Sequence, residues 1–309
     1  MKVLDEIEGA DIDDSDTEVP KEKIKLQFHW YLSIFFVIYY LSYSISGIIF
    51  MVYIIYIFIP NVLLVDNLIA IFTNLNSLLA FIALPLAIIV SYLSRLFIIG
   101  LITRIFWRFT EKRSPTKDGV IPRNIPSKTI NYYHIRSFML KYGKNSFMKG
   151  VFPWLANWFF SFVGASIIES GSTLEESVAT DKGIKVGENC YIGVNSVLAS
   201  HVVEGIFGNV IYFTVKVGDN STFGGFNIVG PGSELSDNSY LLPMAAATKH
   251  NKTKGNNYYY GMPLRRIFKK KIMNYLKVSE DDLERAEGLR VKQENEKLKR
   301  QVKVSNEEV

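Results

Sequence analysis

The sequence predicts a membrane protein of mixed α and β structure, with an N-terminal helical hairpin and a C-terminal parallel β-helix. Two long apolar runs without a charged residue, 30–60 and 68–90, predict the hairpin. A six-residue repeat that begins at Val186 predicts the β-helix. The two signals divide the chain near its middle.

Residues 1–25 form the first segment. They are rich in Asp and Glu and contain few apolar side chains. Such a composition cannot bury enough surface to fold, so we expect a disordered acidic tail.

Residues 26–110 are expected to be a transmembrane helical region. As a helix, the first run would be about 46 Å long, more than the roughly 30 Å of the hydrocarbon core, so it must tilt, bend or project. The second run contains Asn74, Asn76 and Pro85, which favours packing against a neighbouring helix. A third apolar stretch, 96–107, is short and contains Arg104, so we interpret it as an interfacial amphipathic helix.

Basic residues predict the topology. Lys21, Lys23 and Lys25 precede the first run, many Lys and Arg follow the second, and the connecting loop has none. The positive-inside rule then places both termini and the β-helix in the cytoplasm. The first run is too long for a cleaved signal peptide.

Residues 111–163 are expected to be a basic linker with interfacial helices. Between 104 and 149, Lys and Arg greatly outnumber the two acids, Glu111 and Asp118. A basic block beside a membrane span favours anionic lipid headgroups as its partner. No nucleic-acid-binding motif accompanies the charge, so nucleic acid is not expected.

The six-residue repeat defines the segment 164–267. Each unit opens with a large apolar residue, which we expect to point into a triangular core, and Gly, Asn and Asp are expected at the corners. Cys190, the one cysteine, stands at a small-residue place and predicts a buried thiol. The remaining residues, 268–309, predict a charged, solvated helix. The small fifth places of the repeat are Cys190, Ser196, Ser221, Asn227, Ser233 and Ser239.

This repeat resembles that of the hexapeptide acyltransferases. The resemblance implies a left-handed β-helix, a homotrimer with active sites between subunits, and acetyl-CoA or another acyl thioester as donor. Zinc enzymes of this fold need three converging His ligands, and only His201 lies in the repeat, so no metal is expected.

Several short motifs resemble a narrower group, the membrane-embedded terminal domains of polylysine-type peptide synthetases and their stand-alone relatives. The motifs are FVGASI from Phe162, TD at Thr180, HVVE from His201, and GMP from Gly261. The group implies a carrier protein as a possible partner. This chain has one such unit and no adenylation or carrier domain.

His201 is the candidate general base. It stands at the exit of a coil, just before the one interruption of the repeat, and loops on rigid solenoids often carry sites. Glu204, three residues on, is expected to orient its ring. The alternative is a solvated loop histidine. We expect His29 at the membrane edge, His134 in a packing or headgroup role, and His250 in a solvated loop.

The substrate contacts are assigned by position and resemblance. Asp181 has two interpretations, the cap of a corner turn or a ligand of the acceptor's amine, and Asn227 is also expected at the acceptor. The resemblance places the turn formed by Tyr260, Gly261 and Pro263 along the CoA slot. Arg265, just after it, is expected to meet CoA phosphates or lipid headgroups.

The sequence therefore predicts a membrane-anchored acyltransferase that moves an acyl group from acyl-CoA, or from a carrier thioester, to an amine or hydroxyl at the cytosolic face. Two alternatives stay open. One is a carrier-dependent aminoacyl amide synthase, and the other is a non-catalytic trimeric membrane scaffold.

Overall fold

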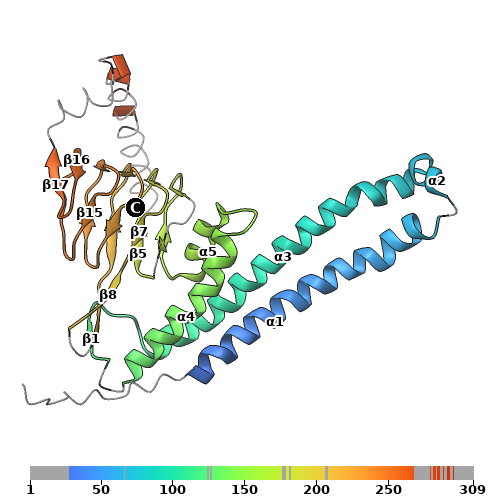
Figure 1. Cartoon of the computed structure of the whole chain (residues 1–309), viewed down its shortest axis with the longest axis horizontal. Coiled ribbons are helices and arrows are strands. Elements are labelled where there is room, and N and C mark those ends of the chain that lie inside the picture. The colour runs from blue at the N-terminus through green and yellow to red at the C-terminus, as the bar shows by residue number, and fades with distance from the viewer. Residues whose placement is uncertain are drawn as a thin grey trace, which may run out of the picture.

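The computed structural model describes residues 28–65, 67–123, 125, 127–175, 179–180, 182–205 and 208–267, with isolated positions between Ser279 and Asn295. A long helical hairpin projects from one side of a β-helix, and two shorter helices fill the angle between them (Figure 1). The predicted acidic tail, Asp181 and most of the charged C-terminal segment lie outside the described residues.

The hairpin has two antiparallel arms. The outward arm is α1 (Phe28–Tyr53), which continues as the π-helix η1 (Ile54–Leu63) around Pro60. The return arm consists of α2 (Leu68–Thr73) and α3 (Leu75–Arg113). Asn67 and Asn74 cap α2 and α3 by accepting hydrogen bonds from backbone N–H groups, so both helix starts are fixed locally.

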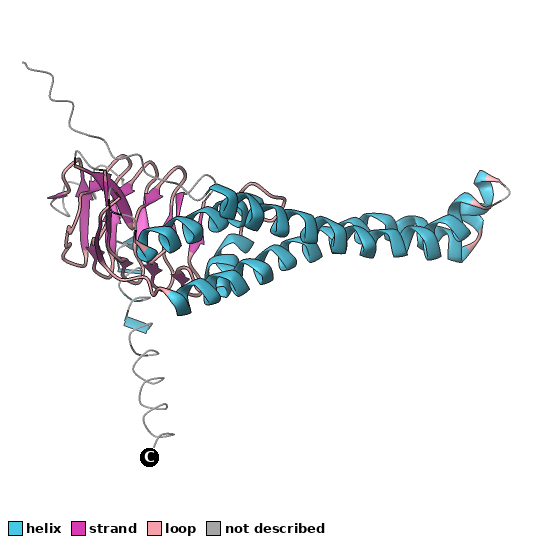
Figure 2. Ribbon diagram, turned by 90° about the horizontal axis from the view of Figure 1, so that it is seen from below, coloured by secondary structure: helices cyan, strands magenta, loops and turns pink. Residues whose placement is uncertain are grey.

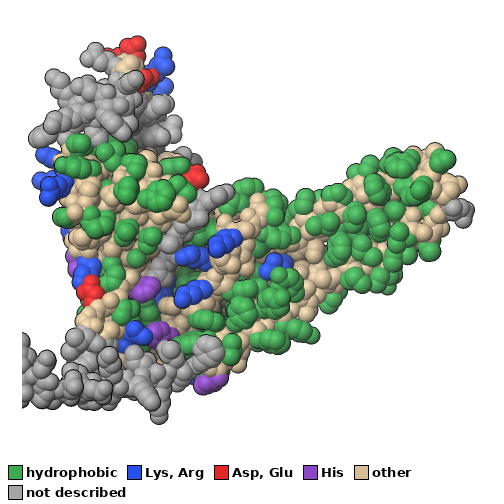
Figure 3. Space-filling model, in the orientation of Figure 1, with side chains coloured by type: hydrophobic (Ala, Val, Ile, Leu, Met, Phe, Trp, Pro, Cys, Tyr) green, Lys and Arg blue, Asp and Glu red, His purple; other side chains and the backbone are tan. Residues whose placement is uncertain are grey.

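Both arms are long and apolar enough to cross a membrane. The candidate spans are His29–Leu63, with 35 residues, and Leu75–Arg113, with 39. At 1.5 Å per residue each arm exceeds the roughly 30 Å of a hydrocarbon core. In Figure 3 the outer part of the hairpin is covered by apolar side chains and shows no charged group.

The stretch 96–107 is not a separate interfacial helix, because it lies inside α3. No Gly or Pro interrupts the chain between Pro85 and Gly100, so nothing ends the helix there. Leu96 and Ile99 are buried in the main core rather than exposed to an interface. Arg95, which separates the second apolar run from the third, lies where α3 begins to pack against the rest of the protein.

Helices α4 (Lys128–Met148) and α5 (Leu155–Val163) join the hairpin to the β-helix, as Figures 1 and 2 show. The rings of Phe147 and Phe159 stack across them, with centroids 4.8 Å apart. Gly143 permits this approach, because a Cβ at that position would lie 2.2 Å from the Phe159 ring. One core therefore runs from α1 and α3 through α4 and α5 into the β-helix.

The β-helix is built from three parallel sheets whose strands repeat in turn along the chain. Thr173 pairs with Tyr191, and Tyr240 with Tyr258, so each coil takes eighteen residues, or three repeat units. The predicted parallel β-helix is confirmed, and its left-handed winding stays an expectation from the resemblance.

The first sheet contains β2 (Ile167–Ile168), β5 (Ile184–Val186), β10 (Val215–Val217) and β13 (Glu234–Leu235). The second contains β3 (Thr173–Leu174), β6 (Tyr191–Ile192), β11 (Thr222–Phe223), β14 (Ser239–Leu241) and β16 (Asn257–Tyr260), with β17 (Arg265–Ile267) antiparallel at its edge. The third contains β4 (Ala179–Thr180), β7 (Val197–Leu198), β12 (Ile228–Val229) and β15 (Ala246–Ala247).

The interior of the β-helix follows the repeat. The large first-place residues are buried, and Ile192, Leu198, Phe223 and Val229 are completely so. The small fifth-place residues are buried as well, including Cys190, whose pKa is raised by burial. The predicted core positions are confirmed.

The corners use left-handed backbone at the fourth place of the repeat. Asn fills five of these places, including Asn189 and Asn220, with φ of 54° and 55°, and Gly fills others, such as Gly232 with φ of 72°. Three corners hold other side chains, Phe226, Met244 and His250, although bulky residues adopt positive φ at a higher cost. His250 is thus a corner residue in an exposed turn, in agreement with the expected solvated loop, and its ring packs edge-on against that of Phe213, at 4.5 Å between centroids.

A β-hairpin interrupts the coils at the predicted place. Strands β8 (His201–Glu204) and β9 (Asn209–Tyr212) pair antiparallel, and β1 (Gly119–Ile121) joins β9 to complete a separate three-stranded sheet. The next coil resumes in register, because Val215 of β10 pairs with Ile184 of β5. The hairpin therefore adds a small sheet without disturbing the coil stack.

We predict that Met244→Asn raises the free energy of unfolding by about 1 kcal/mol, because Asn adopts the left-handed conformation at lower cost. Met244 is 75% exposed and so loses little packing. Chemical unfolding of the full chain in detergent micelles measures the change. Met262→Asn, at an exposed position without positive φ, is the control, and a less stable Met244→Asn protein would contradict the prediction.

Candidate active site

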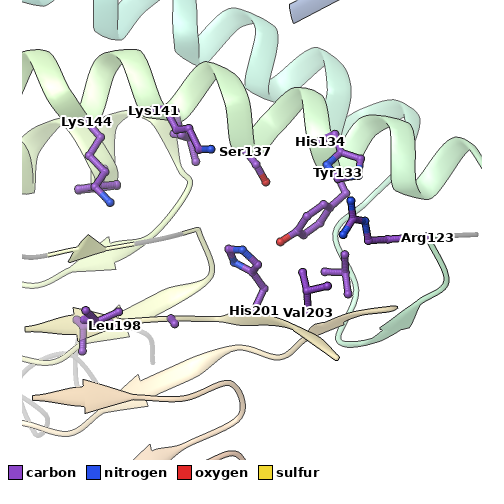
Figure 4. A pocket seen from close by; sticks show the side chains of 14 residues that line it. Arg123, Tyr133, His134, Ser137, Lys141, Lys144, Leu198, His201 and Val203 are labelled. Atoms are coloured by element: carbon purple, nitrogen blue, oxygen red, sulfur yellow. The ribbon is translucent and has the colours of Figure 1, made fainter. Parts of the chain in front are cut away.

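The inserted hairpin presents His201 to helix α4. His201 stands opposite Tyr212, and Val203 opposite Val210, across the two strands. Successive side chains of a strand point to opposite faces, so these four share one face. Figure 4 shows His201 and Val203 directed from the hairpin towards α4.

A cavity of about 410 Å³ lies between that face and α4. It contains both apolar side chains and several basic ones, and two of its residues are histidines, His201 and His134. Its walls come from the connector between β1 and α4, from α4 and α5, from β7, and from the hairpin. The lining residues are Arg123, Tyr133, His134, Ser137, Leu140, Lys141, Lys144, Phe160, Val197, Leu198, Ala199, His201, Val203 and Val210.

A buried lysine ties α4 to the β-helix beside this cavity. The Lys182 ammonium donates hydrogen bonds to the Tyr133 carbonyl oxygen at 3.0 Å and to the Ser137 Oγ at 2.7 Å. It also lies 3.4 Å from the centre of the Tyr133 ring. Because the side chain is completely buried, these contacts fix the position of α4 over the coil that carries Lys182.

His134 is the residue that sequence analysis missed. Its pKa is lowered from 6.5 to about 4, first by burial and then by positive charges, of which Arg123 and Lys182 have the largest effect. Its Nε2 atom is buried and has no hydrogen-bond partner in the described part of the chain. The signal in the sequence was weak. His134, Ser137, Lys141 and Lys144 recur at the spacing of one helix face, but only the fold shows that this face meets His201.

Glu204 does not face the cavity. It lies on the opposite face of β8 from His201 and forms an ion pair with Lys249 of the β-helix. Strand alternation therefore separates the two residues that the sequence analysis had paired. In a helix, a carboxylate three residues after the histidine would lie on the same face, whereas in a strand it lies on the opposite face.

Asn227 has a structural role. Its side chain is completely buried, donates to the carbonyl oxygens of Leu242 and Ala245 at 2.7 and 3.1 Å, and accepts from the Gly225 N–H. These bonds satisfy backbone groups inside a corner of the coil. The expected acceptor contact is therefore corrected at this position. Asp181, the other expected contact, lies outside the described residues.

The expected donor residues lie at the last coil. Tyr260 ends β16, Gly261 has φ of 75°, Pro263 follows a cis peptide bond, and Arg265 is exposed at the start of β17. This turn is three coils from the coil that leads to His201, or about 14 Å along the stack. The structure brings none of these residues into the cavity, and their role at a CoA slot stays a prediction.

Metal-binding side chains do not gather in the described residues, where no group of three or more His, Cys, Asp or Glu is placed to hold an ion. The cavity's two histidines are accompanied by cationic groups, which disfavour a metal cation.

No protein-family model and no curated protein matches the sequence. Among solved structures, the chain is similar to the hexapeptide-repeat-containing acetyltransferase VCA0836 from Vibrio cholerae, at 15% identity and a TM-score of 0.32, over 35% of this chain and 64% of that one. It is similar to AntD, an N-acyltransferase from Bacillus cereus solved with dTDP and 3-hydroxybutyryl-CoA, at 12% identity and a TM-score of 0.27, over 37% and 79%. A maltose O-acetyltransferase from Clostridium difficile 630 is similar at 18% identity and a TM-score of 0.28, over 56% and 86%.

These structural neighbours are acyl- or acetyltransferases, the class that the six-residue repeat predicted. The chain spans less than two thirds of the first of them. Because each TM-score is below 0.5, the fold rests on the strand register described above. The closer relation to terminal domains of polylysine-type synthetases stays a prediction.

We predict that the His134 side chain destabilises the folded protein as the pH falls from 6.5 to 4. In that window the unfolded chain binds a proton that the folded chain does not. The lowered pKa corresponds to about 3 kcal/mol at pH 4, and solvent screening at the half-buried ring reduces the expected drop in the free energy of unfolding to about 2 kcal/mol. Above pH 6.5 the effect vanishes. Thermal unfolding between pH 4 and 8 measures it. His134→Gln should flatten the pH dependence and His29→Gln should not, whereas equal slopes would contradict the prediction.

Proposed function

We propose that the protein is a membrane-anchored acyltransferase that moves an acyl group from acyl-CoA, or from a carrier thioester, to an amine or hydroxyl acceptor. The observation that carries the proposal is the position of His201. It faces a cavity closed by α4, at the junction of the β-helix and the apolar hairpin. The repeat supports the acyltransferase class, and the cavity supports His201 as part of the reacting centre.

His201 is the general base of the proposed reaction. It accepts the proton of the acceptor's amine or hydroxyl as that atom attacks the thioester carbon. The C–S bond then breaks, and the thiolate leaves and takes up a proton. Leu140, Phe160 and Val203 give the cavity apolar walls, which limit access of competing water. Cationic side chains along the opposite wall favour the negative charge that develops on the thioester oxygen.

The acceptor is proposed to lie at the membrane surface. Helix α4 packs directly on the arms of the hairpin, so the cavity and the candidate spans belong to one continuous body. With the topology given by the basic residues, this body lies on the cytosolic side, where acyl-CoA is available. A homotrimer is part of the proposal through the family resemblance.

The donor is proposed to reach the cavity along the coil stack from the turn at Tyr260, Gly261 and Pro263. An extended thioester arm would have to cover the three coils between that turn and His201. Arg265, exposed beside the turn, is suited to the phosphate end of such a donor.

We predict that His201→Ala lowers turnover at least 100-fold, because removal of a general base removes the proton transfer. The test is thiol release from acetyl-CoA by the full chain in lipid nanodiscs with mixed amine and hydroxyl acceptors. His29→Ala, outside the cavity, is the matched control.

Other outcomes favour the alternatives. Release that needs a carrier-bound aminoacyl donor would favour the amide synthase. A wild-type protein inactive with every donor, whose cellular phenotype survives His201→Ala but not deletion of the β-helix, would favour the scaffold.

We also predict that Glu204→Gln lowers kcat less than about tenfold, because its ion pair with Lys249 lies on the strand face away from the cavity. The same nanodisc assay measures the effect, with Lys249→Gln as the partner variant. A loss as large as that of His201→Ala would show that Glu204 acts on the base after all.

A further inference from the structure

The α4 wall of the cavity carries a stripe of basic and polar side chains. His134, Ser137, Lys141 and Lys144 follow one another at intervals of three, four and three residues, so they share one face of the helix. Arg123 adds a guanidinium from the connector that precedes α4. Among the residues that line the cavity, all of them described, there is no Asp or Glu.

Two buried nitrogen atoms in this wall lack hydrogen-bond partners within the described part of the chain. They are the Nε2 of His134 and the Nε of Arg123. Figure 4 shows the two side chains close together at one end of the cavity, beside Tyr133. Buried polar atoms are nearly always paired, so such atoms indicate a partner that the protein itself does not supply.

We infer that the cavity binds a phosphate group of one of the two substrates, held by Arg123, His134 and Lys141. A phosphate oxygen is an acceptor that suits a guanidinium, which can donate two parallel hydrogen bonds to it. His134 lies among cations, and a phosphate anion would offset their repulsion and let the ring donate from Nε2 as well. The stripe would then hold the charged end of the substrate while His201 faces its reacting end.

The phosphate site rests on the proposed function only in that the bound molecule is taken to be a substrate. Binding itself can be measured without turnover. The phosphate can come from two sources. It can belong to the acceptor, as the headgroup of an anionic membrane lipid. It can instead belong to a donor that enters through the cavity rather than past Arg265, as the phosphates of coenzyme A or of a phosphopantetheine arm.

The experiment measures binding to the full chain in nanodiscs. One arm compares the thermal stabilisation given by CoA with that given by pantetheine, which has no phosphate. The other compares nanodiscs of phosphatidylcholine alone with nanodiscs that contain phosphatidic acid. Arg123→Gln and His134→Gln are the variants. Lys117→Gln, at an exposed position on the segment that leads to β1, and His29→Gln are their matched controls.

We predict that wild type is stabilised by the phosphate-bearing probe of one arm, and that Arg123→Gln and His134→Gln each weaken that binding about tenfold or more. The controls should bind as wild type does. A response confined to CoA assigns the phosphate to the donor, and one confined to phosphatidic acid assigns it to the acceptor.

Equal binding by variants and wild type, or no phosphate-dependent response in either arm, overturns the inference. The two proposals can fail separately. Loss of turnover in His201→Ala with unchanged phosphate binding in the Arg123 and His134 variants would leave only the acyltransferase proposal standing. Phosphate binding that these variants abolish, in a protein without thiol release, would leave only the phosphate site standing.

Discussion

The stacking of coils in strict eighteen-residue register is the constraint on which the rest of the structure depends. The coils that begin at Val186, Val217 and Leu235 each place three apolar first-place residues in the interior, and any residue added within a coil would displace them. The hairpin of β8 and β9 is tolerated because it leaves at a corner and returns to the same register at Val215. It is therefore the place in the described coils where a side chain can reach far from the stack, and His201 stands at its base.

The parts of the fold that the sequence predicts are those encoded within one unit. The repeat places Phe223 inside, Cys190 at a small buried place and Asn189 at a corner, because each role depends on a position within six residues. The unbroken course of α3 was missed for a related reason. The charge at Arg104 favoured a separate interfacial helix, although in the fold this side chain lies over the ring of Phe162, just as Arg95 lies over that of Tyr43.

The site could be predicted only in part, because it is assembled from segments far apart in the chain. The place of His201 in the repeat made it a candidate, whereas His134 belongs to no motif and joins the candidate site only because Lys182 fixes α4 above the coil. The errors at Glu204 and Asn227 have different causes. Glu204 points away from His201 because side chains alternate along a strand, and this could be inferred only once residues 201–204 were known to form a strand. Asn227 is occupied by hydrogen bonds inside the coil, and its small-residue place in the repeat already indicated that it would be buried.

The same packing that positions His201 also sets the electrostatics of the cavity. Lys182 must be buried to hold α4, and its charge, together with that of Arg123, keeps His134 unprotonated near neutral pH. An anion bound among these cations would be attracted to them and would favour protonation of His134. The lysine that joins α4 to the β-helix therefore also adds positive charge to the cavity beside His134. The proposed anionic substrate would use these charges, whereas an uncharged substrate would leave them without a counter-charge.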